Sequence, residues 1–165
     1  MIFGVFGCGP KKPSNLPKLH SCTIRLTMDG KPVDKASVTL FPEGEGENDD
    51  GLWGCAGYTD SKGSVTLKTD GLYSGIPAGR YKVCVFKVER EEQEYLGYFE
   101  SKSLPPPKTT VIVDLKYDDP DQTPLVVEVG SGKGKAFDLE VTAAANPELP
   151  PNYGMIKATR GLKKK

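Results

Sequence analysis

The 165-residue sequence predicts an all-β fold, a β-sandwich of seven to eight strands with an N-terminal tether and a C-terminal tail. Three observations lead to this class. Apolar and polar residues alternate with a period of two along most of the chain. The alternating runs are short and end at Gly, Pro, Asn or Asp, as strands do. The 19 glycines and 14 prolines favour many turns over long helices.

The predicted strands lie within residues 21–141. They are CTIRLTM (22–28), SVTL (37–40), SVTL (64–67), RYKVCVF (80–86), TTVIVDL (109–115), PLVVEV (124–129) and KAFDLEV (135–141). Alternation within them places one set of side chains between two sheets. This inward set is Ile24, Leu26, Val38, Leu40, Val65, Leu67, Val83, Val85, Leu125, Val127, Phe137 and Leu139. The outward set is Arg25, Thr39, Thr66, Lys82, Glu128 and Asp138. The best helix candidate, 88–102, is as easily a long excursion between strands.

The N-terminus predicts a membrane anchor. The apolar run IFGVFG stops at Cys8, and the junction VFGC resembles a bacterial lipobox. We interpret residues 1–7 as the remnant of a lipoprotein signal peptide and Cys8 as the lipidated residue. The Pro-rich segment 8–20 is then a tether. Stable anchoring needs more than one acyl chain, which a diacylglyceryl cysteine supplies. The alternative is a buried cysteine on a frayed N-terminus.

After Val141 the period of two ends. Residues 142–165, TAAANPELPPNYGMIKATRGLKKK, are rich in Ala, Pro and Lys and basic at their end. We expect a flexible tail that is dispensable for folding, because such a segment has too little apolar surface to offset its ordering entropy. If the tail packs at all, Tyr153 and Ile156 are the residues through which it would do so.

Three stretches share their order and spacing with a known family. LTMDGKPVDKASVTLFP, GYTDSKGSVTL and GIPAGRYKVCVF resemble the carboxypeptidase regulatory-like domains, with Ala78 where that family usually has proline. Residues 116–141 further resemble small bacterial lipoproteins that have one such domain. The resemblance covers about 21–141 and implies a transthyretin-like (prealbumin-like) sandwich of seven strands.

Individual residues of these stretches also have structural roles without the family. Gly30 and Gly63 stand where hairpin turns need positive φ. Asp60 can accept backbone N–H groups within its turn. Tyr81 enters a strand where a tyrosine corner would bury its ring and bond its hydroxyl to the backbone.

The sequence argues against an enzyme and against a cofactor. Its one histidine, His20, stands beside no cluster of acids or thiols, which argues against a histidine-dependent triad and against most zinc sites. The acidic stretches 43–51 and 118–122 would suit calcium, but neither has the EF-hand order, so we predict no metal. Lys+Arg equals Asp+Glu at 22 each, so no net field recruits nucleic acid.

Three cysteines follow Cys8, so at most one pair can close among them. Alternation places Cys22 on the inner face and Cys84 on the outer face, which weakens that pairing, and the connectivity with Cys55 stays open. Four aromatic residues form the candidate binding surface, because exposed rings grip sugars and protein partners. They are Trp53, Tyr95, Tyr98 and Phe99. The alternative is that these rings cap the open ends of the sandwich.

Together these features predict a non-enzymatic lipoprotein of the bacterial cell envelope, anchored at the outer membrane. Its sandwich would serve structural or binding roles, with a protein or a carbohydrate as partner. The alternative is a carbohydrate-binding or accessory subunit of an envelope polysaccharide or export system.

Overall fold

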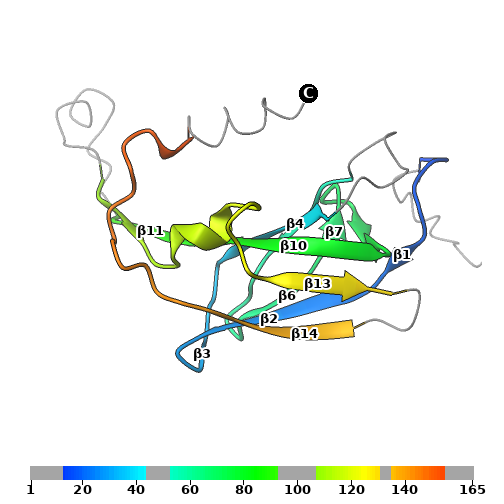
Figure 1. Cartoon of the computed structure of the whole chain (residues 1–165), viewed down its shortest axis with the longest axis horizontal. Coiled ribbons are helices and arrows are strands. Elements are labelled where there is room, and N and C mark those ends of the chain that lie inside the picture. Colours follow the sequence, from blue (N-terminus) through cyan, green and yellow to red (C-terminus); the bar gives the residue numbers. More distant parts are fainter. Residues whose placement is uncertain (1–12, 44–52, 93–106, 131–134, 155–165) are drawn as a thin grey trace, which may run out of the picture.

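The computed structural model describes residues 13–43, 53–92, 107–130 and 135–154, and these form an all-β sandwich (Figure 1). The first nine strands are β1 (Leu19–His20), β2 (Cys22–Met28), β3 (Lys31–Pro32), β4 (Ser37–Pro42), β5 (Cys55–Tyr58), β6 (Ser64–Thr66), β7 (Lys68–Thr69), β8 (Tyr73–Ser74) and β9 (Ile76–Pro77). The later strands are β10 (Gly79–Phe86), β11 (Val88–Arg90), β12 (Thr109–Val111), β13 (Val126–Val129) and β14 (Lys135–Val141). Within these four ranges, no helix has the length and apolar character that crossing a bilayer requires.

Two sheets face each other. The larger has six strands in the order β13-β10-β4-β5-β7-β8, and the smaller has the order β14-β2-β3, with β6 also paired to β2. Figure 1 shows β10 and β13 on one side and β2 and β14 on the other. All of these pairings are antiparallel except that of β14 with β2. Two short pairs, β1 with β9 and β11 with β12, extend the structure beyond the sandwich.

The predicted register is confirmed. Every residue of the inward set is buried except Leu125, Phe137 and Leu139, which are partly buried and pack against the core. The outward set is exposed at four positions and half-buried at Thr39 and Lys82. Because a slip of one residue would have exchanged the two sets, alternation was sufficient to identify which face of each predicted strand points toward the core.

The sequence of the turn before β6, T-D-x-x-G, is explained by its hydrogen bonds and its backbone conformation. The Asp60 carboxylate accepts the backbone N–H of Lys62 at 2.8 Å and of Ser64 at 2.9 Å. These two hydrogen bonds lower the pKa of Asp60. Gly63 has a φ of 70°, and a Cβ there would lie 2.5 Å from the carbonyl oxygen of Leu26. Only glycine therefore fits, both in conformation and in space.

Tyr81 makes the backbone bond that its position predicts. Its side chain is buried in the core, and its hydroxyl donates to the carbonyl oxygen of Pro77 at 2.9 Å. Burial raises the pKa of Tyr81 to about 12. The hydroxyl therefore stays neutral, and its hydrogen bond joins β10 to the preceding strand, β9.

Three local features differ from the expected strands. The sequence predicted no strand at Cys55–Tyr58, where the structure has β5. The run 109–115 divides into β12 and a 3-10 helix, η2 (Leu115–Asp118), because the Asp114 side chain caps that helix by accepting the N–H of Lys116. The segment 88–102 begins as strand β11, and its residues from 93 onward lie outside the described ranges.

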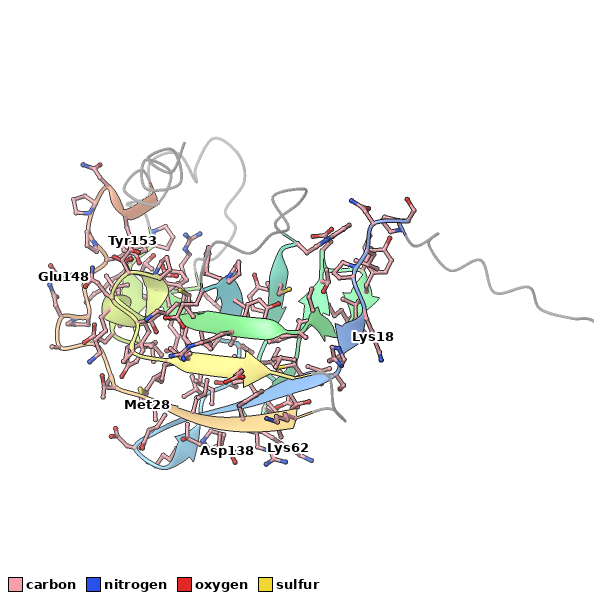
Figure 2. The ribbon with its side chains drawn as sticks, turned by 45° about the vertical axis from the view of Figure 1, so that its right-hand side comes forward. Lys18, Met28, Lys62, Asp138, Glu148 and Tyr153 are labelled. Carbon is pink, nitrogen blue, oxygen red and sulfur yellow. The ribbon has the colours of Figure 1, made fainter. Side chains whose placement is uncertain are left out.

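The start of the tail packs on the sandwich. Bridges pair Ala143 with Val113 and Glu148 with Thr110. The ring of Tyr153 stacks on Phe86 with 5.8 Å between centroids, and its hydroxyl donates to an Asp118 carboxylate oxygen at 2.6 Å. Figure 2 shows Tyr153 beside η2, at one end of the larger sheet. Packing through Tyr153, expected from the sequence, is therefore observed over 142–154, while Ile156 lies outside the described residues.

Candidate functional site

The outer face of the larger sheet exposes two aromatic side chains. Tyr58 on β5 is 75% exposed and Phe41 on β4 is 41% exposed. Tyr58 pairs with Ser37, and the neighbouring pair includes the core residue Val38, so Tyr58 points away from the core. Phe41 pairs with Lys82 of β10, next to the pair of core residues that includes Val83. Both rings therefore project from the same side of the sheet.

A polar strip separates the two rings. Between them on this face lie Thr39 and Ala56, which pair across β4 and β5. Ser37 and Phe41 are four residues apart on one strand, so the rings stand roughly 13 Å apart along it. We call Ser37, Thr39, Phe41, Ala56 and Tyr58 the aromatic strip. It has an aromatic side chain at each end, and this spacing suits an extended ligand better than a compact one.

The two cations beside the strip share one carboxylate. Arg80 Nε lies 2.6 Å from one carboxylate oxygen of Glu43, and Lys82 Nζ lies 3.6 Å from the other. The backbone N–H of Glu43 also donates to the carbonyl of Arg80 at 2.8 Å. Because one carboxylate bridges two cations, this group of three residues keeps a net positive charge beside the strip.

Most of the binding surface predicted from sequence lies outside the described residues. Cys8, Tyr95, Tyr98 and Phe99 belong to this group. Trp53 is described and half-buried, and its carbonyl oxygen accepts a hydrogen bond from the Cys55 thiol at 3.4 Å. The sequence reasoning missed Phe41 and Tyr58. Their positions on the outward side of β4 and β5 were the available signal, but β5 itself was not predicted.

An open cavity of about 300 Å³ lies near the β2–β3 turn. Its lining is Met28, Asp29, Lys31, Pro32, Val33, Lys87 and Ile112. Lys87 is the most buried cation there, with a side chain only 10% exposed. Its ammonium lies 2.7 Å from Asp34 Oδ1 and 3.8 Å from Glu89 Oε1. The hydrogen bond from Lys87 lowers the pKa of Asp34, so this group is an ion pair at neutral pH. We assign it a structural role.

Two carboxylates of the acidic stretch 118–122 accept hydrogen bonds from other groups of the protein. Asp119 accepts the N–H of Asp121 at 3.0 Å and the side-chain amide of Gln122 at 2.7 Å. Asp118 accepts the hydroxyl of Tyr153. Across the part of the chain that the structure describes, no three His, Cys, Asp or Glu side chains gather as metal ligands would. His20 is buried in β1, paired with Ile76.

Comparison with known proteins does not identify a family. No family model and no curated protein matches the chain. The major pilin subunit of Bacillus cereus is 14% identical, with a TM-score of 0.44 over 76% of this chain and 30% of that one. An adhesin candidate from Bacteroides ovatus is 15% identical, with a TM-score of 0.37 over 76% of this chain and 45% of that one. A DUF3823 family protein from Parabacteroides merdae is 12% identical, with a TM-score of 0.33 over 79% of this chain and 47% of that one.

The chain thus spans less than half the length of each of these structures. Because every one of the three TM-scores is below 0.5, the similarities support no inference about function. The resemblance of residues 21–141 to carboxypeptidase regulatory-like domains stays a prediction.

Proposed function

We propose that this protein is a non-enzymatic lipoprotein of the bacterial cell envelope, anchored through Cys8, whose sandwich presents the aromatic strip to a partner. The observation that supports a binding role is the exposure of Tyr58 and Phe41 on one face of the sheet. Large rings are costly to leave in water and are enriched where proteins grip partners. The structure also admits the anchor, because the chain enters the sandwich through β1, at one end of the sheets (Figure 1).

A carbohydrate-binding module is the second candidate. Its support is the composition of the strip, in which Ser37 places a hydroxyl group beside Tyr58 and Thr39 places one between the two rings. Stacking on a ring combined with hydrogen bonds from hydroxyls is chemistry that suits a chain of sugars. A protein partner would use the same rings as apolar anchors, so the two candidates differ in ligand and share the site.

The anchor is tested by metabolic labelling. The full chain, expressed in a bacterium behind a complete lipoprotein leader, is labelled with a tagged fatty acid. We expect label in the wild type and none in Cys8→Ser. The matched control is Cys84→Ser, which should label like the wild type because Cys84 is buried in the folded domain. Equal labelling of Cys8→Ser and wild type would rule out the anchor.

The binding role is tested with two ligand sets, a glycan array and a pull-down from envelope extracts. Tyr58→Ala and Phe41→Ala should each weaken binding at least tenfold, the size expected for an aromatic anchor. Leu72→Ala is the control, since Leu72 is 62% exposed but lies off the strip, between β7 and β8. Binding that survives both substitutions would show that the strip is not the site. Binding to glycans alone would select the second candidate.

A further inference from the structure

Two buried cysteines stand at the same corner of the sandwich, on opposite sheets. Cys22 is the first residue of β2, and Cys55 is the first residue of β5. Both are free thiols, at 0% and 1% exposure, and both belong to the hydrophobic core. Cys55 pairs with Leu40, a core residue, so its side chain points inward from the larger sheet. Cys22 points inward from the smaller sheet, in phase with Ile24.

The chain itself joins these two positions. Strand β6 ends at Thr66 in the smaller sheet and β7 begins at Lys68 in the larger, so Leu67 alone crosses from one sheet to the other. The N–H of Leu67 donates to the carbonyl of Cys22 at 3.1 Å. Cys55 pairs with Thr69, two residues further on. At this corner the sheets therefore converge below the roughly 10 Å that separates stacked sheets.

We propose that Cys22 and Cys55 form a disulfide that joins the two sheets when the protein folds under oxidising conditions. The oxidant is a small-molecule or protein disulfide. One cysteine thiolate attacks it, forming a mixed disulfide and releasing one thiolate. The second cysteine thiolate then attacks the mixed disulfide at the sulfur of the first, forming the Cys22–Cys55 bond and releasing the second thiolate. Two electrons pass to the oxidant, and the two cysteine protons pass to solvent or to the released thiolates.

Cys84 has no part in this pair. It faces Thr39 on the side of β10 and β4 opposite to the core, although it is only 3% exposed. It is also absent from the core cluster that contains the other two cysteines. The sheet itself lies between Cys84 and Cys22, which is the separation that alternation along β10 predicts.

The electrostatics of the corner indicate when the two thiols would react. Burial raises the pKa of Cys22 to about 11, with a further contribution from Cys55. Burial likewise raises the pKa of Cys55. Both thiols also contribute to the raised pKa of Tyr81. Since the thiolate is the attacking species, both react slowly once buried, and the bond would form while the sandwich is still assembling.

The test is a disulfide map of the refolded full chain. Reduced, denatured protein is diluted into a buffer of reduced and oxidised glutathione, free thiols are blocked with iodoacetamide, and the protein is cut with trypsin. Cleavage after Lys and Arg places Cys22, Cys55 and Cys84 in the separate peptides 19–25, 36–62 and 83–87. We expect peptides 19–25 and 36–62 as one linked species, and peptide 83–87 alkylated.

Several outcomes would overturn the proposal. They are a linked species that contains Cys8 or Cys84, persistent glutathione on Cys22 or Cys55, and alkylation of all cysteines. The map uses the wild type, so a variant that fails to fold does not affect it. A second readout is thermal: the oxidised wild type should melt about 10 °C above its reduced form. The Cys22→Ala/Cys55→Ala double variant should show no such difference, and Cys84→Ala should keep it.

Discussion

The two faces of β10 have different surroundings, although they belong to one strand. On the inner face, Tyr81, Val83 and Val85 pack against the opposite sheet and belong to the core. On the outer face, Phe86 lies under the tail residue Tyr153, and Lys82 sits beside the exposed ring of Phe41. The inner face is covered by another sheet along its length, whereas the outer face is covered at Cys84 and by the tail at Phe86, and is only half-buried at Lys82. Side chains on the inner face therefore hold the sandwich together, and the exposed side chains on the outer face are available to contact a partner.

The largest effect should come from opening the inner layer. Leu26→Ala should lower the free energy of unfolding by about 3 kcal/mol, because Leu26 is fully buried and its truncation leaves a cavity. The matched control is Thr66→Ala in the same sheet, where the side chain is exposed. It should change stability by less than about 0.5 kcal/mol. Urea unfolding measures both, and equal losses would contradict the assignment of the inner face.

A smaller effect is expected where the tail covers the outer face. Tyr153→Ala should lower stability by about 1–2 kcal/mol, because it removes the stacking on Phe86 and the hydrogen bond to Asp118. Asn152→Ala, at the exposed neighbouring position, should be neutral. The same contacts predict that deleting 143–165 destabilises the fold, which differs from the sequence expectation that this tail is dispensable. A melting temperature unchanged by the deletion would restore that expectation.

The smallest effect is expected from removing a single hydroxyl group, that of Tyr81, near the other end of β10. Tyr81→Phe should lower stability by about 1 kcal/mol, because the carbonyl of Pro77 loses its donor while the ring stays buried. Tyr58→Phe is the control, since that side chain is exposed on the outer face. Thermal unfolding should resolve the two variants, and an equal response would mean that the Tyr81 hydroxyl contributes nothing to the fold.

Most of the sandwich was predictable because period two reports burial directly. Leu26, Val38 and Val65 alternate with polar neighbours, and each lies in the core. The strand β5 was not predictable in this way, because its sequence CAGY contains small residues whose alternation is weak. Gly57 lies in β5 at a position where a Cβ atom would come within 2.6 Å of the Val65 side chain. This constraint is visible only in the packed structure.

The candidate site was harder to predict than the core. Trp53 was predicted to be an exposed aromatic of the binding surface, yet it is half-buried, while the more exposed Tyr58 stands at the end of β5, which was not predicted. Exposure of an aromatic ring depends on what the rest of the chain covers, and the periodicity of a single strand contains no such information. The packing of Tyr153 on Phe86 is a similar case, since it joins segments 67 residues apart.

The contrast between the two faces of β10 is tested most directly on two adjacent residues. Val83→Ala and Lys82→Ala truncate neighbouring side chains of one strand, so their positions along the sheet are nearly matched. Equilibrium urea unfolding should show a loss of about 2 kcal/mol or more for Val83→Ala, which empties part of the core, and less than about 1 kcal/mol for Lys82→Ala. A loss for Lys82→Ala equal to or greater than that for Val83→Ala would contradict the register of the larger sheet and, with it, the placement of the aromatic strip on the outer face.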